Sequence, residues 1–313
     1  MPHDSAVTST RSATMALLGL LAVSATWGSS FPLTKVVLEQ VSTPDFLAVR
    51  FTLAAVVMAA LFHRSVRALP RSVLGKGAIL GGLYGTGQLV QTLGLQYTPA
   101  AISGFITGLY VVLTPICAAV LLRTAVGTRV WIGTALAAVG LGFLALNDSL
   151  SIGIGESLTA ASALIYALHI VGLSAWSRSE QALGLAVVQI AVTALVSLVA
   201  AVPDGIELPH TPGVWLAVIY MALVSGALAM IVQSWAQAHL APSRAAIIMS
   251  TEPLWATVFA VSFFDEQLTM RIVIGGIAIL TAMLLVELRP RRRASAPGDR
   301  PDPRPEDLPK LAA

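Results

Sequence analysis

Charge is what this sequence has least of. Only 11% of its 313 residues are Asp, Glu, Lys or Arg, whereas a soluble domain has about 25%. The mean hydropathy is correspondingly high, at +0.80. This composition excludes an ordinary soluble domain and indicates a chain that lies within a lipid bilayer. The formal net charge of +3 is small, so we expect no nucleic-acid partner.

Cysteine and catalytic motifs are scarce as well. Cys117 is the single cysteine, so no internal disulfide can form, and we expect it to be a small packed side chain. The sequence contains no GxxxxGK[ST] loop, no HExxH, no paired-cysteine metal spacing and no GxSxG turn. We therefore expect no catalytic residues, no metal site, no cofactor and no bound ATP, which leaves proton coupling as a possible source of energy.

Long apolar runs are what the sequence has instead. A helix needs about 20 residues to cross the hydrocarbon core. Ten runs come close to that length: 15–38, 44–63, 72–95, 100–121, 128–147, 154–176, 182–202, 213–237, 243–264 and 268–288. They lack the strict alternation of barrel strands, and the first run extends past any small-residue signal cleavage site. The sequence predicts an all-α polytopic membrane protein with ten transmembrane helices.

Basic residues between the runs predict the orientation, because Lys and Arg gather on the cytoplasmic side of a membrane. They follow the second, fourth, sixth and last runs: Arg64, Arg67, Arg71, Lys76, Arg123, Arg129, Arg178, Arg289, Arg291, Arg292 and Arg293. The opposite connections are mostly acidic: Asp148, Asp204, Glu207, Asp265 and Glu266. We expect a multi-pass protein of the cytoplasmic (inner) membrane with both termini in the cytoplasm and with contacts to membrane lipid.

The ten runs divide into two sets of five. The fourth runs of the two sets are the most similar pair. Their sequences are QYTPAAISGFITGLYVVLTPICAAVLL at 96–122 and HLAPSRAAIIMSTEPLWATVFAV at 239–261. Each has a proline at its entrance and a second proline within the predicted helix. Because five is odd, the second set crosses the membrane in the opposite sense, which is the inverted-repeat plan of many secondary transporters.

Four segments follow from this division. Residues 1–14 form a cytoplasmic tail, 15–147 the first five-helix repeat and 148–288 the second. The remaining residues, 289–313, are basic and rich in proline, so we expect them to be disordered. In inverted-repeat transporters the site lies near the midplane between the halves, beside interrupted helices.

Four short motifs resemble the EamA family of the drug/metabolite transporter superfamily. They are TWGSSFPLTK at 26–35, FLAVRF at 46–51, GFITGLYVVLTP at 104–115 and STEP at 250–253. The resemblance covers residues 15–288. It implies ten helices in two EamA repeats, a central cavity lined by spans one to four and six to nine, and movement of a small metabolite across the inner membrane. Family members carry very different substrates, so the resemblance does not name the cargo.

Glu252 is the sharpest candidate for a functional residue. It lies nine residues into its predicted span, roughly 14 Å deep in a core about 30 Å thick. A carboxylate there must be protonated, paired or hydrated, because a charge facing lipid is costly. It could exchange a proton or hold a cationic group of the substrate. The alternative is structural, with Glu252 bonding backbone groups that Pro253 leaves free.

The third span carries polar groups on one face. Tyr84, Gln88 and Gln91 are spaced i, i+4 and i+7, so they could contact substrate or bond a neighbouring helix. A stripe of small residues that permits close helix packing runs beside them: Gly77, Gly81 and Gly85.

Two basic residues lie within the first two spans. Arg50 could attract a carboxylate or phosphate of the substrate, or it could serve the fold. Lys35 could assist it, although a long basic side chain near the end of a span more readily reaches lipid headgroups.

The remaining candidates are polar or aromatic side chains in other spans. They are Trp27, Ser30, Tyr110, Thr114, His169, Gln233 and Trp235. A single membrane histidine is more often a packed hydrogen-bonding residue than a proton relay, and the tryptophans could be packing or interfacial residues. Ser30 belongs to TWGSSFPLTK, where Pro32 predicts an interruption of the first helix and a thin, polar surface.

These features together predict a secondary active transporter. We expect it to move a small metabolite, an amino-acid-like or similar polar solute, most simply by export through alternating access; a homodimer is possible. The alternatives are a lipid or drug efflux carrier of the same fold and a non-transporting membrane protein, such as an intramembrane enzyme or a receptor. The absence of a catalytic motif argues against an enzyme.

Overall fold

The computed structural model describes most of the chain, and within that part every regular element is helical. The described residues are 3–122, 127–145, 153–176, 178, 180–239 and 248–287. The basic tail, the predicted entrance proline Pro242 and the connections bearing Arg123 and Asp148 lie outside them.

The helices follow the apolar runs of the sequence. Their bounds are α1 His3–Leu38, α2 Thr43–Arg67, α3 Arg71–Leu95, α4 Ala100–Gly108, α5 Tyr110–Leu122, α6 Thr128–Ala145, α7 Ile154–Trp176, α8 Ala182–Ala201, α9 Pro212–Ala222, α10 Ala229–His239, α12 Glu252–Phe263 and α13 Met270–Glu287. A 3₁₀ turn, η1 (Val202–Asp204), follows α8, and a π-helical segment, η2 (Leu223–Leu228), joins α9 to α10.

Within the described part of the chain, six helical segments are long and apolar enough to cross a membrane. They are Thr14–Leu38, Thr43–Arg67, Ala100–Leu121, Ile154–Leu173, Ala182–Ala201 and Pro212–Gln233. Two shorter apolar helices occupy the fifth and tenth runs, at Thr128–Leu144 and Met270–Leu285. Helices therefore occupy all ten predicted runs, and six of them have membrane-spanning length and composition.

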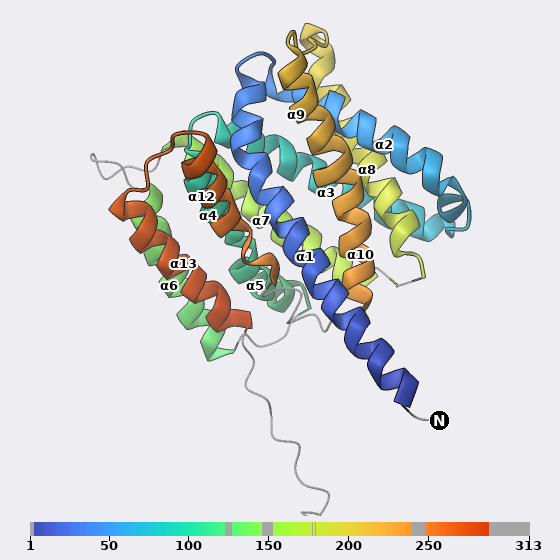
Figure 1. Cartoon of the computed structure of the whole chain (residues 1–313), viewed down its shortest axis with the longest axis horizontal. Helices are drawn as coiled ribbons and strands as arrows, with labels where there is room; N and C mark the ends of the chain where they lie inside the picture. The colour runs from blue at the N-terminus through green and yellow to red at the C-terminus, as the bar shows by residue number, and fades with distance from the viewer. Residues whose placement is uncertain are drawn as a thin grey trace, which may run out of the picture.

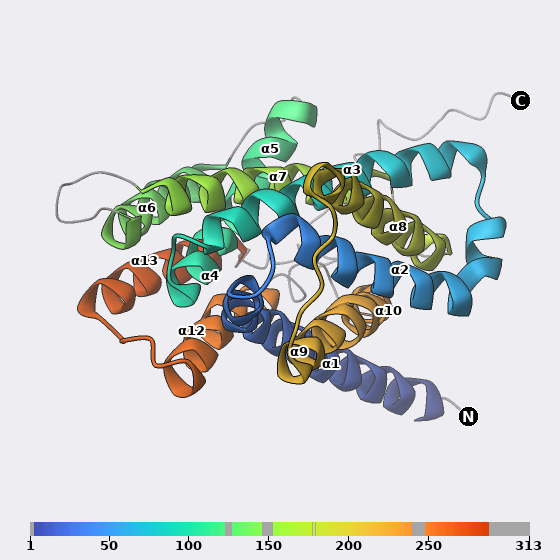
Figure 2. The same cartoon turned by 90° about the horizontal axis from the view of Figure 1, so that it is seen from above.

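Helices from the two halves of the chain pack against each other in a reciprocal pattern. The second helix of each half, α2 and α8, form one pair, and the fifth helices, α6 and α13, form another at one edge of the molecule (Figure 1, Figure 2). The first half contributes α3 to a contact with α7, and the second half contributes α10 to the matching contact with α1. The main helix contacts therefore remain the same when the two halves are exchanged: the α3–α7 contact corresponds to the α10–α1 contact, and the α2–α8 and α6–α13 pairs correspond to themselves.

Three predictions about helix continuity need correction. We expected Pro32 to interrupt the first helix, but α1 is helical from His3 through Pro32 to Leu38. We expected 213–237 to be one regular helix, but η2 interrupts it with six π-helical residues. We also placed Pro253 within a helix, whereas it lies in the first turn of α12, where its missing N–H costs no hydrogen bond.

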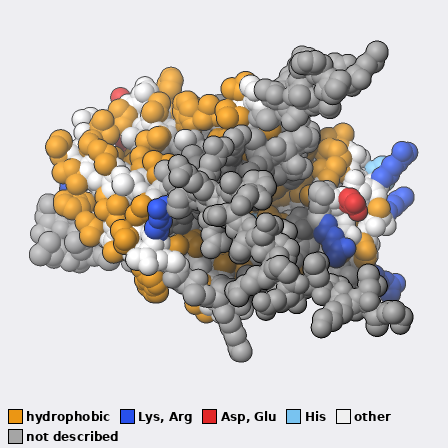
Figure 3. All heavy atoms as spheres, turned by 90° about the horizontal axis from the view of Figure 1, so that it is seen from below, with side chains coloured by type: hydrophobic (Ala, Val, Ile, Leu, Met, Phe, Trp, Pro, Cys, Tyr) orange, Lys and Arg blue, Asp and Glu red, His pale blue; other side chains and the backbone are white. Residues whose placement is uncertain are grey.

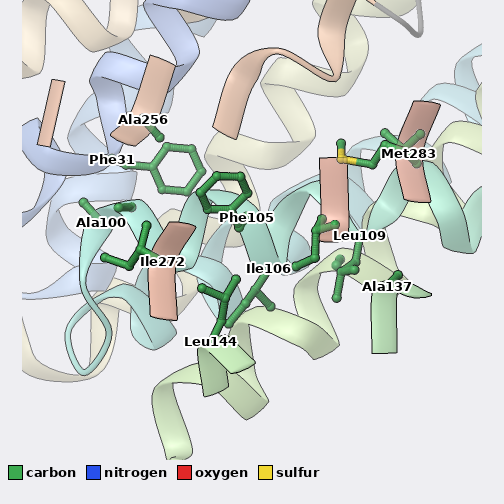
Figure 4. Close-up of a cluster of buried hydrophobic side chains, with 14 of the residues drawn as sticks. Phe31, Ala100, Phe105, Ile106, Leu109, Ala137, Leu144, Ala256, Ile272 and Met283 are labelled. Atoms are coloured by element: carbon green, nitrogen blue, oxygen red, sulfur yellow. The ribbon is translucent and has the colours of Figure 1, made fainter. Parts of the chain in front are cut away.

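A large apolar cluster joins α4 to α1, α6, α12 and α13. Phe105 and Ile106 of α4 lie at its centre, with Phe31 and Met283 on either side (Figure 4). A second cluster joins α2 to α1, α8 and α9. Burying this apolar surface does not drive association in lipid as it does in water, so close packing at small residues has to hold the helices together.

The outer surface is apolar, as lipid contact requires. Large apolar side chains that lie mostly exposed include Leu61, Val199, Leu216 and Phe263. On the face shown in Figure 3, apolar side chains cover both flanks, and most of the Lys and Arg side chains gather at one end.

Candidate functional site

A cavity with a volume of about 170 Å³ lies between the two halves of the chain. Among the described residues, its lining comes from α1 to α5 of the first half and from α7, α8, η2, α10, α12 and Met249 of the second. The paired helices α6 and α13 contribute none of these lining residues, as expected for the fifth and tenth spans.

The structure brings ten of the thirteen candidate residues to this cavity. They are Trp27, Ser30, Arg50, Tyr84, Gln88, Gln91, Tyr110, His169, Gln233 and Glu252. Of the other three, Lys35 and Thr114 are not among the lining residues, and Thr114 Oγ1 donates to the carbonyl of Tyr110 at 2.7 Å. Trp235 belongs to α10, but its side chain is outside the described part of the structure. Whether these residues act on a substrate remains a prediction.

Glu252 is the carboxylate of the cavity. It is the first residue of α12, directly before Pro253, and it is hydrogen bonded to the hydroxyl of Tyr110 from the first half. The free N–H groups and the dipole at a helix N-terminus favour an anion. This position therefore supports both alternatives, since Glu252 can stabilise the start of α12 and still present a carboxylate to the cavity.

Arg50 is the cation of the cavity. Its side chain is 7% exposed, and its guanidinium lies over the rings of Phe46 and Phe51, with distances of 5.8 and 5.1 Å to the two ring centroids. Within the described residues, its Nε is buried without a hydrogen-bond partner. Cation–π contacts stabilise the charge in part but leave the N–H donors unused.

Tyr84 connects the neighbourhood of Arg50 to the second half of the chain. Its ring centroid is 6.1 Å from that of Phe51, 5.9 Å from that of Tyr166 and 5.4 Å from that of His169. Such ring contacts restrict Tyr84 to one orientation. The aromatic wall of the cavity is therefore built by both halves.

A chain of hydrogen bonds crosses from α3 to α7 and to α4. Gln88 Nε2 donates to the hydroxyl of Tyr166 at 2.8 Å, and that hydroxyl donates to Gln91 Oε1 at 2.9 Å. Gln91 Nε2 in turn donates to Thr107 Oγ1 at 2.9 Å. The two glutamines therefore bond neighbouring helices, which was the structural alternative for them, while they also line the cavity.

His169 is held by an amide of α8. One ring nitrogen, Nε2, lies 2.7 Å from Gln189 Oε1, and Gln189 Nε2 donates to the carbonyl of Leu185 at 3.2 Å. Because an amide oxygen can only accept, His169 Nε2 donates the hydrogen bond to Gln189 Oε1. This arrangement agrees with the packed hydrogen-bonding role expected for a single membrane histidine.

The polar stretch of α1 packs against the π-helical segment. Trp27 Nε1 donates to the carbonyl of Ser225 at 2.9 Å, and the hydroxyls of Ser30 and Ser225 lie 2.7 Å apart. A π-helical turn frees a backbone carbonyl from the regular α-helical pattern, so an external donor can bind it. α1 therefore has the predicted thin, polar surface. The interruption lies in the segment that packs against this surface, η2, and not in α1.

Gly28 explains how closely α1 approaches α12. A Cβ added there would lie 2.5 Å from the Cβ of Trp255 and 2.7 Å from the amide nitrogen of Ala256. Only glycine fits at such a distance.

At the end of α1, Lys35 does not point to lipid headgroups. Its Nζ donates to the carbonyl of Thr98 at 2.9 Å, just before α4 begins. The amides of Ala100 and Ala101 at the start of α4 donate to Glu266, at 2.6 and 3.1 Å to the two carboxylate oxygens. A loop of the second half thus caps a helix of the first, and we call Glu266, Ala100 and Ala101 the inter-half clasp.

Several cavity residues were missed in the sequence. Tyr166 precedes His169 by three residues, so the helical repeat placed both on one face, and Gln189 is an amide within an apolar run. The helical spacing and the amide could therefore have identified Tyr166 and Gln189 from the sequence. Ser225 and Thr107 carried none, because small hydroxyl side chains are common in membrane helices.

Among the described residues, no cluster of three or more His, Cys, Asp or Glu side chains could hold a metal ion. Cys117 is buried beside Ala167 and Val171, as a small packed side chain. The described lining of the cavity offers charged, hydrogen-bonding and aromatic side chains.

Comparison with known proteins identifies the family. The model of the EamA-like transporter family matches residues 14–146 and matches a second time at 153–288. The chain belongs to the EamA-like transporter family. The two matches are the two repeats expected from the sequence, so this EamA-family protein consists of two copies of one unit.

Similar proteins agree with that assignment. The EamA-family protein is 32% identical over 272 residues to a protein of Archaeoglobus fulgidus described as an uncharacterized transporter, covering 87% of this chain and 85% of the relative. A protein of known crystal structure has the same fold, with a TM-score of 0.63 over 90% of this chain and 98% of its own, at 20% identity. The protein is therefore a membrane transporter of this family.

Proposed function

We propose that this EamA-family protein is a secondary active transporter that exports a small polar metabolite across the cytoplasmic membrane. The observation that carries the proposal is the cavity between the two repeats, which is lined by an arginine, a carboxylate and several amides in an otherwise apolar bundle. Ionisable groups within membrane spans mark substrate pathways, because they are too costly to retain without use.

The mechanism is alternating access by movement of one repeat against the other. Support comes from the reciprocal helix pairs, in which helices of the two repeats pack on each other around the cavity, the arrangement in which inverted-repeat transporters rock one part against the other. The inter-half clasp joins the two repeats at one end of this interface, and its hydrogen bonds break when that end opens. Both termini lie in the cytoplasm, in agreement with the basic residues after every second run.

Proton coupling takes place at Glu252. A proton that enters as the substrate leaves neutralises the carboxylate, so the empty carrier does not return with an unpaired charge in the membrane. Tyr110 of the other repeat is hydrogen bonded to this carboxylate, so protonation of Glu252 alters a contact between the two repeats.

Transport and coupling are tested in proteoliposomes that contain the full chain. Labelled metabolites released by overexpressing cells are loaded inside, and flux is followed with and without an imposed pH gradient. We expect flux that the gradient accelerates, and exchange without gradient response in Glu252→Gln. Absence of flux for every released metabolite would reject transport. Flux of the wild type that ignores the gradient would reject coupling, as would a Glu252→Gln protein with an unchanged gradient response.

The matched control is Glu207→Gln. Glu207 is exposed in the loop before α9, so the same chemical change there leaves flux and its gradient response as in the wild type.

A further inference from the structure

Five basic side chains belong to one end of the helix bundle, and none of them lines the cavity. They come from the end of α2, the start of α3 and the connection after α7: Arg64, Arg67, Arg71, Lys76 and Arg178. Figure 2 shows α2 and α3 meeting at the edge of the molecule that lies opposite α6 and α13. The orientation expected from the sequence puts this end in the cytoplasm. We call these five residues the basic corner.

Packing brings the connection after α7 to the turn between α2 and α3. A Cβ at Gly184, in the first turn of α8, would lie 2.6 Å from the carbonyl oxygen of Ser65 in α2. Trp176, the last residue of α7, packs on the apolar cluster that contains Leu69 of the same turn. Arg178 lies in the short connection between Trp176 and Gly184. The basic corner therefore takes residues from both repeats.

Little negative charge opposes the basic corner. The sequence contains no Asp or Glu between Asp45 and Asp148, and Glu180 is the one acidic residue in the connection after α7. Four of the five basic side chains are exposed, and Lys76 is half-buried. Within the described part of the chain, none of the five is bonded to a carboxylate or to a carbonyl. Their N–H donors are therefore available to a partner outside the chain.

Exposed apolar side chains place the basic corner at the edge of the hydrocarbon core. Leu61 precedes Arg64 by three residues and is 66% exposed, and Ile79 follows Lys76 by three residues and is 56% exposed. Three residues of helix span about 4.5 Å, so a side chain suited to lipid tails lies close to each cation. Long basic side chains at this depth reach the phosphate groups of lipids.

We propose that the basic corner binds the phosphate headgroup of an anionic membrane lipid, and that the bound lipid bridges the two repeats at their cytoplasmic ends. Clusters of four to eight Lys or Arg residues directly beside a membrane span bind anionic headgroups. The guanidinium groups suit this partner, because their planar fork matches the oxygens of a phosphate. The proposal does not depend on transport.

Binding to the purified protein separates this site from the orientation signal. Basic residues on the cytoplasmic side also direct membrane insertion, but that role ends once the chain has folded. A site for lipid keeps its preference for anionic headgroups after the protein has been extracted from the membrane.

The test is native mass spectrometry of the full chain in detergent, with phosphatidylglycerol and phosphatidylethanolamine that carry the same acyl chains. We expect phosphatidylglycerol to bind roughly tenfold more tightly and to raise the thermal unfolding midpoint, whereas phosphatidylethanolamine does not raise it. Glycerol 3-phosphate offers a phosphate without acyl chains, and it should not displace the lipid.

Substitutions locate the binding to the basic corner. Combined Arg64→Gln, Arg67→Gln and Arg71→Gln should bring the two lipids to within about twofold of each other, whereas Lys at the same three positions retains the preference. Arg178→Gln, a single change in an exposed connection, should weaken phosphatidylglycerol binding and reduce the rise of the midpoint. This single variant tests the site and the bridge even where the triple variant does not fold.

The matched control is Arg129→Gln. Arg129 lies in the first turn of α6, on the side expected to face the cytoplasm but outside the basic corner, so this variant retains the wild-type preference. Equal binding of the two lipids, an unchanged preference in the triple Gln variant, an equal loss in Arg129→Gln, or displacement of the lipid by glycerol 3-phosphate would each overturn the site. A full rise of the midpoint in Arg178→Gln would overturn the bridge between the repeats.

Discussion

Tyr166 shows how one side chain can hold two helices and a cavity wall together. Its hydroxyl accepts a hydrogen bond from Gln88 and donates one to Gln91, while its ring packs on Tyr84. The side chain is 7% exposed, so water does not readily replace a lost partner. The orientation of both glutamines in the cavity therefore depends on one oxygen atom.

Replacing Tyr166 with Phe should destabilise the protein although the ring remains. The amides of Gln88 and Gln91 each lose a partner in a buried site, at a cost of about 1–3 kcal/mol. The measurement is the thermal unfolding midpoint of the purified protein. Tyr97→Phe is the control, because Tyr97 is 64% exposed. Equal midpoints for the two variants would contradict this role of the Tyr166 hydroxyl.

At the scale of helices, the glycines of α3 set its distance from α8. A Cβ at Gly81 would lie 2.7 Å from the carbonyl oxygen of Gln189 and 2.8 Å from Val192 Cβ. Gly85 meets Thr193 and Val196 in the same way, one turn further along. The predicted small-residue stripe thus has α8 as its partner, and Gln189 reaches the cavity because α8 can come this close.

Alanine substitutions at two adjacent glycines should therefore differ in their effect on stability. Gly81→Ala forces α3 away from the α8 backbone, and overpacking of this kind costs about 1–3 kcal/mol. Gly82→Ala adds a methyl group with nothing within 4 Å, so its effect on stability is close to zero. The unfolding midpoints of the two variants decide the matter, and a Gly82 variant as unstable as the Gly81 variant would refute the packing argument.

Contacts between neighbouring helices also explain why Pro32 does not interrupt α1. A proline in a helix removes one hydrogen bond and frees a carbonyl, and neighbouring helices can supply the lost interactions in a membrane bundle. Around Pro32, Ser30 bonds the hydroxyl of Ser225, and Gly28 packs on α12. The interruption occurs instead in η2, opposite the polar stretch of α1.

At the scale of the whole molecule, several polar contacts outside the cavity connect the two repeats. The inter-half clasp is one of them, because Glu266 of the second repeat bonds two amides that begin α4 in the first. A carboxylate at a helix N-terminus is favoured by the free N–H groups and the helix dipole. The clasp therefore holds one end of the molecule closed.

Replacing Glu266 with Gln should loosen that end. In Gln an NH2 group replaces one of the two carboxylate oxygens, so the backbone amide that bonded this oxygen loses its acceptor, and the negative charge that strengthened the other hydrogen bond is lost. We expect faster hydrogen–deuterium exchange of these two amides by roughly tenfold, while the amides within α8 retain their protection. Glu207→Gln is the control, and unchanged exchange at Ala100 and Ala101 would show that the carboxylate does not hold α4.

The sequence by itself determined the class of the protein and its organisation into two repeats. Ten apolar runs have helical length, and few charged residues lie among them, so the helical membrane fold follows from composition and spacing alone. Polar residues in such runs are rare, which is why the sequence singled out Glu252, Arg50 and the face of Gln88 and Gln91. The reason is local: hydropathy and helical periodicity belong to each segment separately.

Tertiary structure alone decided which of these groups meet. Lys35 bonds Thr98 instead of reaching for headgroups, because α1 ends beside the start of α4. Tyr166 and Ser225 enter the cavity because of the helices opposite them, and no local pattern records that. Arg50 and Glu252 lie about two hundred residues apart in the chain, and only the packing of one repeat against the other brings them to the same cavity.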